Sequence, residues 1–167
     1  MNDSSGGVLP PVRSSIRVPC PPEEAFRVFT SGLNSWWPLG TYSINGDKAV
    51  SCSMEPRSGG AVFETDAGGA THGWGIVTSW EPPNRLVIRW HPFGGSHTAQ
   101  EVEVRFTDRG SSTLVELEHR NWEALGDEAS EIRGRYEGGW PNVLALFAIA
   151  AGGDKEAQAV RSSPEEG

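Results

Sequence analysis

The chain has 167 residues, a length that is usual for a single domain. Its formal net charge is −8 and its isoelectric point is about 5.0, so the sequence excludes the broad basic surface that nucleic acids or anionic membranes require. Hydrophobic residues make up only 37 %, but seven Trp and six Phe supply large apolar side chains for a core.

Three features concern the ends of the chain and its location. No apolar run approaches the roughly 20 residues of a membrane-spanning helix, and no secretory signal precedes the first strand. Residues 1–13 and 153–167 lack apolar periodicity, so we expect disordered tails around one domain over residues 14–152. Cys20 and Cys52 are isolated, which favours free thiols in a reducing cytoplasm.

The first third of the chain predicts a strand followed by one or two short helices. Residues 14–20 read as a short strand. Residues 21–24 are two prolines and two glutamates, which suit the first turn of a helix because its free N–H groups and dipole favour them. Residues 25–29 are apolar at helical spacing, and Gly32 ends this helix. A second short helix or tight turn would carry residues 34–37.

From residue 49 to residue 120, apolar side chains recur at every second position, as in strands with one dry face. Short turns at residues 81–84 and 108–111 favour antiparallel pairing of consecutive strands. The residues expected on the dry face are Val50, Cys52, Met54, Trp74, Ile76, Thr78, Trp80, Leu86, Ile88, Trp90, Val102, Val104, Phe106, Val115, Leu117 and His119.

After Trp122 the spacing becomes helical again, and residues from about Asp127 to Ala151 predict a C-terminal helix. Pro141 follows two glycines, so either the helix restarts there or one long helix is kinked. The dry face of the sheet must be covered by this apolar helix. The sequence therefore predicts an α+β fold in which about six to seven antiparallel strands curve around a long C-terminal helix.

Three motifs in this order resemble the START/SRPBCC superfamily, whose helix-grip fold is also called the birch-pollen-allergen fold. The motifs are EAFRVFTSGLNSWWP (24–38), GWGIVTSWEPPNRLVIRW (73–90) and GGWPNVLALFA (138–148). Within the superfamily they resemble the bacterial branch of homologues of the activator of heat shock protein 90 ATPase. The resemblance covers residues 14–151.

The resemblance implies a deep cavity between the sheet and the C-terminal helix. Superfamily members bind lipids, sterols, polyketides and hormones there, so we expect a small lipid-like or polyketide-like ligand and no catalysis. Two alternatives stay open: an enzyme similar to polyketide cyclases or aromatases, and a co-chaperone or stress-related module that binds a chaperone or another protein. We expect no second domain like that of the eukaryotic co-chaperone, which counts against the last alternative. A homodimer is a further expectation.

Trp36 and Trp37 are adjacent, so they cannot point the same way from a regular element, and we expect one in the core and one at the cavity rim. His119 is either a hydrogen-bonded core histidine or a polar group that orients the ligand or transfers a proton. Tyr136 is the other candidate for proton transfer. The cavity candidates are Trp36, Trp37, Trp74, Trp90, Phe106, His119, Tyr136, Trp140, Leu144 and Phe147.

For the remaining charged residues and histidines, we expect mainly structural roles. Arg133 and Arg135 either lie on the solvated face of the last helix or reach a ligand carboxylate. His91 and His97 flank a turn without further ligands, so we expect no metal and no other cofactor. No nucleophile elbow, phosphate-binding glycine loop or Cys–His signature is present. Four acids should face water or cross-strand arginines such as Arg89 and Arg105: Glu101, Glu103, Glu116 and Glu118.

Overall fold

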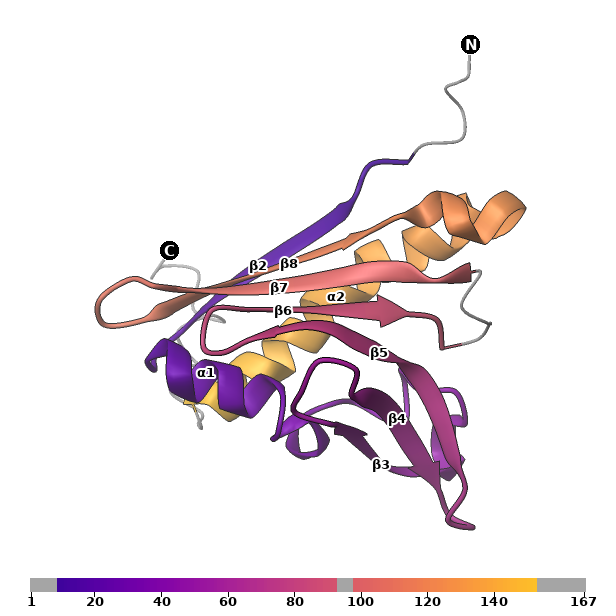
Figure 1. The fold of residues 1–167 in the computed structure, drawn as a ribbon, viewed down its shortest axis with the longest axis horizontal. Coiled ribbons are helices and arrows are strands. Elements are labelled where there is room, and N and C mark those ends of the chain that lie inside the picture. Colours follow the sequence, from indigo (N-terminus) through magenta and orange to yellow (C-terminus); the bar gives the residue numbers. More distant parts are fainter. Residues whose placement is uncertain (1–8, 93–97, 153–167) are drawn as a thin grey trace.

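The computed structural model describes residues 9–92 and 98–152 (Figure 1). Within these residues, seven strands form one antiparallel sheet in the order β2-β8-β7-β6-β5-β4-β3. This confirms the predicted α+β helix-grip fold. The elements are β2 (Val12–Val18), α1 (Pro22–Phe29), β3 (Ala49–Met54), β4 (Ala61–Asp66), β5 (Thr71–Glu81), β6 (Arg85–Trp90), β7 (Gln100–Asp108), β8 (Thr113–Arg120) and α2 (Ala129–Gly152), with 3₁₀ turns at Leu33–Ser35, Gly46–Lys48 and Trp122–Glu128.

Strand β2 begins at Val12, two residues before the expected start. Val12 is buried and pairs with His119 of β8, so residues 12 and 13 belong to the sheet rather than to a tail. Two prolines precede these residues and polar residues follow them, so the sequence did not indicate that the strand begins here. The expected tails otherwise lie largely in residues 1–8 and 153–167, outside the described residues.

Helix α1 forms where the prolines and acids predict it. Pro22 occupies its first turn with two glutamates, and Thr30 closes its end by donating its hydroxyl to the Phe26 carbonyl at 2.7 Å. The apolar face packs on the sheet, with the Phe26 ring centroid 5.0 Å from Trp80 and 5.2 Å from Phe106. The helix therefore covers one end of the apolar face.

The predicted alternation holds on β6, β7 and β8 but fails on β3 and β5. Register shifts interrupt the pairing of β3 with β4, β4 with β5, and β5 with β6. Each such bulge inserts a residue and moves the following side chains to the other face. Val50 is consequently 58 % exposed, and Val77, rather than Ile76 or Thr78, is buried with Trp74.

Glu103 meets cross-strand arginines, one of the two environments expected for it, and its side chain is buried on the outer face of the sheet. It accepts hydrogen bonds from Arg85 Nε at 2.6 Å, Arg105 Nε at 2.7 Å and Arg120 Nη1 at 2.7 Å. Burial raises the pKa of Glu103, but these arginines outweigh it and lower the pKa to about 2. Arg85 of β6 and Arg120 of β8 are the cross-strand partners, whereas Arg105 lies two residues from Glu103 on the same strand, and the network closes over the middle of the sheet.

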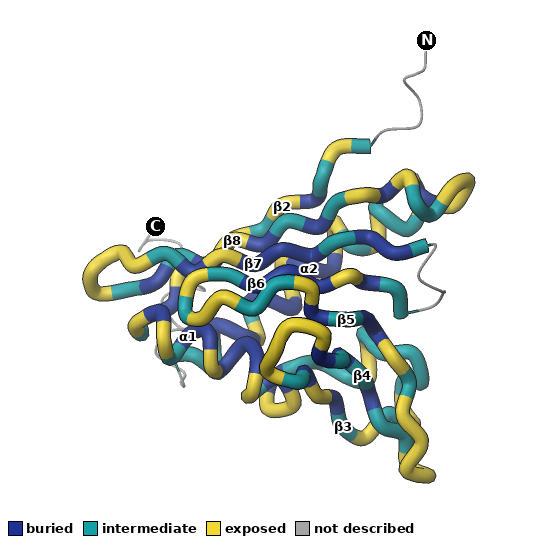
Figure 2. Tube along the Cα trace, viewed as in Figure 1, coloured by how far each residue is buried: buried dark blue, intermediate teal, exposed yellow. Residues whose placement is uncertain are grey.

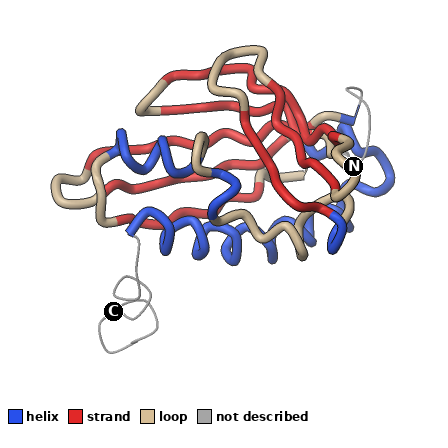
Figure 3. Tube along the Cα trace, turned by 90° about the horizontal axis from the view of Figure 1, so that it is seen from below, coloured by secondary structure: helices blue, strands red, loops and turns tan. Residues whose placement is uncertain are grey.

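Helix α2 is one continuous helix that contains Pro141, and it begins at Ala129 rather than Asp127. Figure 3 shows it running along one side of the sheet. The buried residues of its second half fill the space between helix and sheet. They are Trp140, Val143, Leu144, Phe147 and Ala148.

The core lies between α2, α1 and the inner face of the sheet, and exposed segments gather at the hairpin turns (Figure 2). Cys20 and Cys52 are both free, as expected. Burial, with a smaller contribution from nearby Glu64, raises the pKa of Cys52 to about 12, so its thiol stays protonated. Across residues 9–92 and 98–152, no helix has the length and apolar character needed to cross a bilayer.

Candidate functional site

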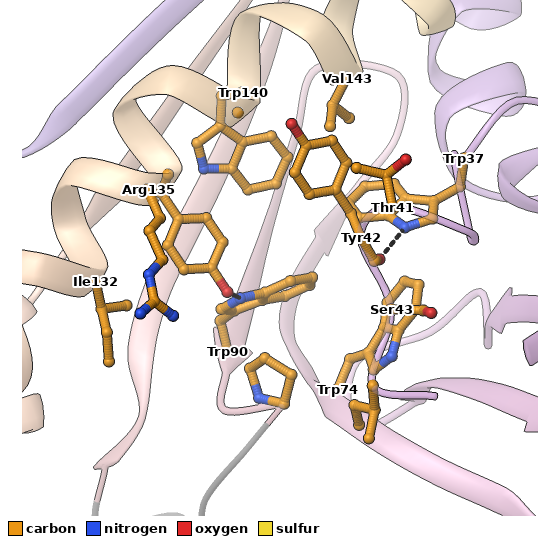
Figure 4. Close-up of a pocket in the computed structure, with 14 residues that line it drawn as sticks. Trp37, Thr41, Tyr42, Ser43, Trp74, Trp90, Ile132, Arg135, Trp140 and Val143 are labelled. Carbon is orange, nitrogen blue, oxygen red and sulfur yellow. Dashed lines mark hydrogen bonds between the residues drawn. The ribbon is translucent and has the colours of Figure 1, made fainter. Parts of the chain in front are cut away.

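A cavity of about 480 Å³ lies between the sheet, α2 and the segment that precedes β3 (Figure 4). We call residues 41–45 of that segment the strap. The sheet side contributes Trp74 of β5, Trp90 of β6 and the following Pro92, and Trp37 joins them from the turn after Leu33–Ser35. The strap and α2 form the other sides with Thr41, Tyr42, Ser43, Ile44, Ile132, Arg135, Tyr136, Gly139, Trp140 and Val143.

The two adjacent tryptophans divide as predicted between core and cavity. Trp36 is buried, its indole N–H donates to the Val28 carbonyl at 2.8 Å, and its ring packs on Phe29 and Phe147. Trp37 is half-buried and lines the cavity. One ring therefore anchors α1 to the core while its neighbour forms part of the cavity wall.

Four tryptophans, Trp37, Trp74, Trp90 and Trp140, line the cavity as a continuous aromatic wall. Their ring centroids lie 5.1–6.3 Å apart in neighbouring pairs, within the range of favourable aromatic contacts. Every indole N–H of this wall already has an acceptor within the protein, so the rings present mainly carbon to the cavity. The hydrogen bonds run from Trp37 to Tyr42 O (2.7 Å), from Trp74 to Glu64 Oε1 (2.6 Å), from Trp90 to Tyr136 Oη (2.8 Å) and from Trp140 to His119 Nδ1 (3.0 Å).

Glu64 of β4 supports the cavity from behind, and sequence reasoning did not single it out. Its carboxylate is fully buried and accepts hydrogen bonds from the backbone N–H groups of Ile44 (2.7 Å) and Asn45 (2.9 Å), from the Asn45 amide (2.9 Å) and from Trp74. Burial raises the pKa of Glu64, but these hydrogen bonds together outweigh it and lower the pKa. One ionised carboxylate thus fixes both the strap and the Trp74 ring.

His119 is fully buried behind the aromatic wall and is not among the residues that line the cavity. Its Nδ1 accepts from Trp140, so its Nε2 carries the hydrogen and donates to Gln100 Oε1 at 3.1 Å. Its ring stacks on Trp122 with centroids 4.0 Å apart, and burial lowers the pKa of His119 to about 3. The geometry favours the core-histidine interpretation, because the ring is fully buried, bonds protein groups through both nitrogens and does not reach the cavity.

The other predicted residues separate into cavity and core. Tyr136 lines the cavity together with the four wall tryptophans. Phe106, Leu144 and Phe147 are buried in the core, outside the lining, with Trp36. The strap was missed because a loop has no periodicity to reveal which side chains point inward. Ile132 and Val143 were missed although they share the helical spacing of Tyr136 and Trp140.

The two arginines of α2 differ in position. Arg133 binds the carbonyls of Pro10 (2.6 Å) and Pro11 (3.2 Å) and so ties the start of β2 to α2. Arg135 borders the cavity, but its side chain is 71 % exposed and pairs with Glu131 at 2.7 Å. In the part of the chain that the structure describes, no three potential ligands gather around a metal position, and His97 lies outside that part.

Comparisons with known proteins agree with this architecture. Residues 19–152 match the family model described as activator of Hsp90 ATPase homolog 1-like protein. No curated protein matches the sequence. The anthrahydroquino-γ-pyrone synthase Txn09, in a structure complexed with SUM, is 34 % identical, with 85 % of this chain and 97 % of that chain covered and a TM-score of 0.59.

Two further structures extend the comparison. The self-sacrificing resistance protein CalC from Micromonospora echinospora is 27 % identical over 85 % of this chain and 94 % of that chain, with a TM-score of 0.63. The Aha1 dimer from Colwellia psychrerythraea is 16 % identical over 86 % and 96 %, with a TM-score of 0.61, and shows the fold alone. Because the family model spans nearly the whole described fold, the chain belongs to the family of activator of Hsp90 ATPase homolog 1-like proteins, within the SRPBCC superfamily.

Proposed function

We propose that this protein binds a flat, largely apolar aromatic molecule in the cavity between the sheet and α2. The observation that carries the proposal is the wall of four tryptophans whose N–H groups are all engaged within the protein. A volume of about 480 Å³ lies within the usual range for small-molecule sites, which are mostly apolar and aromatic. Burial of the ligand rings would supply the affinity.

Preorganisation supports an aromatic ligand over a flexible chain. Each wall ring is fixed by a hydrogen bond and by its neighbours, so little side-chain freedom is lost when a ligand enters. Offset and edge contacts between aromatic rings add stabilisation beyond the buried area. A flat ring system would use such contacts on several sides, whereas an alkyl chain would gain only from burial.

Equilibrium dialysis with the three-ring hydrocarbon fluorene and its saturated analogue perhydrofluorene tests this proposal. We expect fluorene to bind one site and perhydrofluorene to bind more weakly. Val143→Phe fills part of the cavity and should abolish binding, whereas Leu146→Phe, on the exposed side of α2, should leave it unchanged. The proposal would be overturned if the two α2 variants bound fluorene equally well, or if the wild type did not bind fluorene.

A second candidate function is ring-forming chemistry on a polyketide-like aromatic substrate. The observation that favours it is the 34 % identity to the anthrahydroquino-γ-pyrone synthase Txn09, of which 97 % is covered. With His119 engaged on both nitrogens, Tyr136 is the candidate proton donor in the cavity. Incubation with an anthrahydroquinone precursor should then yield a product that Tyr136→Phe fails to form. Binding without turnover would leave ligand binding as the function.

A further inference from the structure

Tyr136 lines the cavity, and its hydroxyl is held in place by a wall tryptophan. Its oxygen accepts the Trp90 indole N–H at 2.8 Å. Its ring meets His119 edge-on with centroids 4.5 Å apart, and lies nearly parallel to Trp140 with centroids 6.1 Å apart. Because the neighbours on either side are themselves hydrogen-bonded, the direction of this phenol is set before any ligand arrives.

The Tyr136 oxygen is engaged as an acceptor, but its own proton has no acceptor among the described residues. Burial raises the pKa of Tyr136, and the hydrogen bond from Trp90, which lowers it, is the smaller effect. The group is therefore a neutral phenol that can donate. Donation from Trp90 also polarises the O–H group and makes it a stronger donor, as in other hydrogen-bond chains.

The other polar groups of the cavity are placed differently. The Tyr42 phenol lies against the backbone of Gly139 on α2. The Ser43 hydroxyl accepts the backbone N–H of Gly46 at 2.8 Å and so serves the turn. The four indole N–H groups are engaged. Arg135 borders the cavity but is largely exposed and paired with Glu131. A ligand acceptor would thus find at Tyr136 a donor whose direction is already set by the aromatic wall.

We infer that the ligand is an aromatic ketone or quinone whose carbonyl oxygen accepts a hydrogen bond from the Tyr136 hydroxyl. This inference rests on the proposed binding of an aromatic molecule and adds the chemical class. The aromatic rings would lie against the wall tryptophans, and the carbonyl would fix which end of the ligand points toward Trp90 and α2. Aromatic hydrocarbons without an acceptor would fit the space but lack this orientation.

The experiment compares 9-fluorenone with fluorene, which have nearly the same shape and differ by the carbonyl oxygen. Equilibrium dialysis with wild type and Tyr136→Phe gives four dissociation constants. We expect the substitution to weaken binding of 9-fluorenone about threefold to tenfold more than it weakens binding of fluorene, because only the ketone loses a hydrogen bond to the hydroxyl, and this factor is the usual effect of one hydrogen bond. Infrared spectroscopy should show the carbonyl stretch of bound 9-fluorenone at lower frequency in wild type than in Tyr136→Phe.

The outcomes separate the inference from the proposed function. Unchanged 9-fluorenone binding in Tyr136→Phe, or equal weakening for both compounds, would overturn the inference while aromatic binding stands. An identical carbonyl frequency in the two proteins would overturn it as well. If the wild type binds neither compound, the proposed function fails and the inference falls with it. Selective weakening for 9-fluorenone with the frequency change supports it.

Discussion

At the scale of single residues, the cavity depends on buried acceptors that lie behind the tryptophans rather than in the cavity itself. His119 accepts the indole N–H of Trp140, and Glu64 accepts that of Trp74. A buried polar group without a partner is costly, so each acceptor and its tryptophan stabilise one another. The position of His119 on the dry face was predictable from alternation. The role of Glu64 was not, because an acid in a strand usually faces water.

The pH dependence of stability tests the environment of His119. Its pKa is about 3 in the folded protein and near 6.5 when unfolded, so its contribution is complete above pH 6.5 and is lost as pH falls toward 3. We expect the free energy of unfolding to fall by about 1 kcal/mol between pH 7 and pH 5.5 from this group. His119→Gln should remove that slope in urea titrations. The same slope in both proteins would contradict the assignment.

Glu64→Gln tests whether the carboxylate orders the strap and Trp74. The glutamine amide places an NH₂ group where one carboxylate oxygen was, so at least one of the donors loses its acceptor. We expect the free energy of unfolding to fall by about 2 kcal/mol or more. Urea denaturation measures this change, and the Trp74 indole N–H resonance should shift. Glu116→Gln, on the exposed side of β8, serves as the control and should change stability by less than about 0.5 kcal/mol. Equal losses in the two variants would refute the role of Glu64.

At the scale of elements, the bulges in β3–β6 decide which predictions fail. The pairings of β6 with β7 and of β7 with β8 contain no register shift, so the alternation of these strands could be predicted from the sequence. The bulges on the other half of the sheet depend on pairing between strands, which no single strand encodes. The continuous course of α2 through Pro141 was left open for a similar reason, since packing on the sheet decides it.

Gly75 allows β5 and β6 to approach each other beside the cavity. It lies opposite Trp90, and a methyl group there would collide with the backbone carbonyl oxygen of Arg89. We expect Gly75→Ala to cost about 1–3 kcal/mol, as in other overpacked sites. Gly73→Ala, in the same strand with open space around it, should not lose stability. Chemical denaturation compares the two, and a similar stability would contradict the close-approach argument.

The contact of the strap with α2 gives a prediction about binding. A methyl group at Gly139 would lie 3.3 Å from Tyr42 Cε1, whereas one at Gly138 would meet nothing within 4 Å. Both alanines should favour the helix by a similar amount, roughly 0.5–1 kcal/mol. Only Gly139→Ala should push Tyr42 and change the affinity for fluorene, as measured by dialysis. Indistinguishable affinities in the two variants would show that the strap does not shape the cavity.

At the scale of the whole molecule, the order of elements and three motifs predicted the fold, because the family pattern covers nearly the entire domain. Trp37, Trp74, Trp90 and Trp140 lie within these motifs and line the cavity, as does Tyr136, which lies just before the third motif. The hydrogen bonds that orient these rings could not be predicted, since their acceptors come from other strands and loops. The boundary between cavity and core also depends on how far the side chains fill the space between sheet and helix, which the spacing of residues in the sequence does not show.

The central claim, that an aromatic ligand lies among the four wall tryptophans, is tested most directly by nuclear magnetic resonance of the seven indole N–H groups. Addition of 9-fluorenone should shift the resonances of Trp37, Trp74, Trp90 and Trp140, assigned with single Trp→Phe variants. The resonances of Trp36, Trp80 and Trp122, whose rings do not line the cavity, should change much less. No shift at saturating ligand, or shifts confined to the latter group, would contradict the claim.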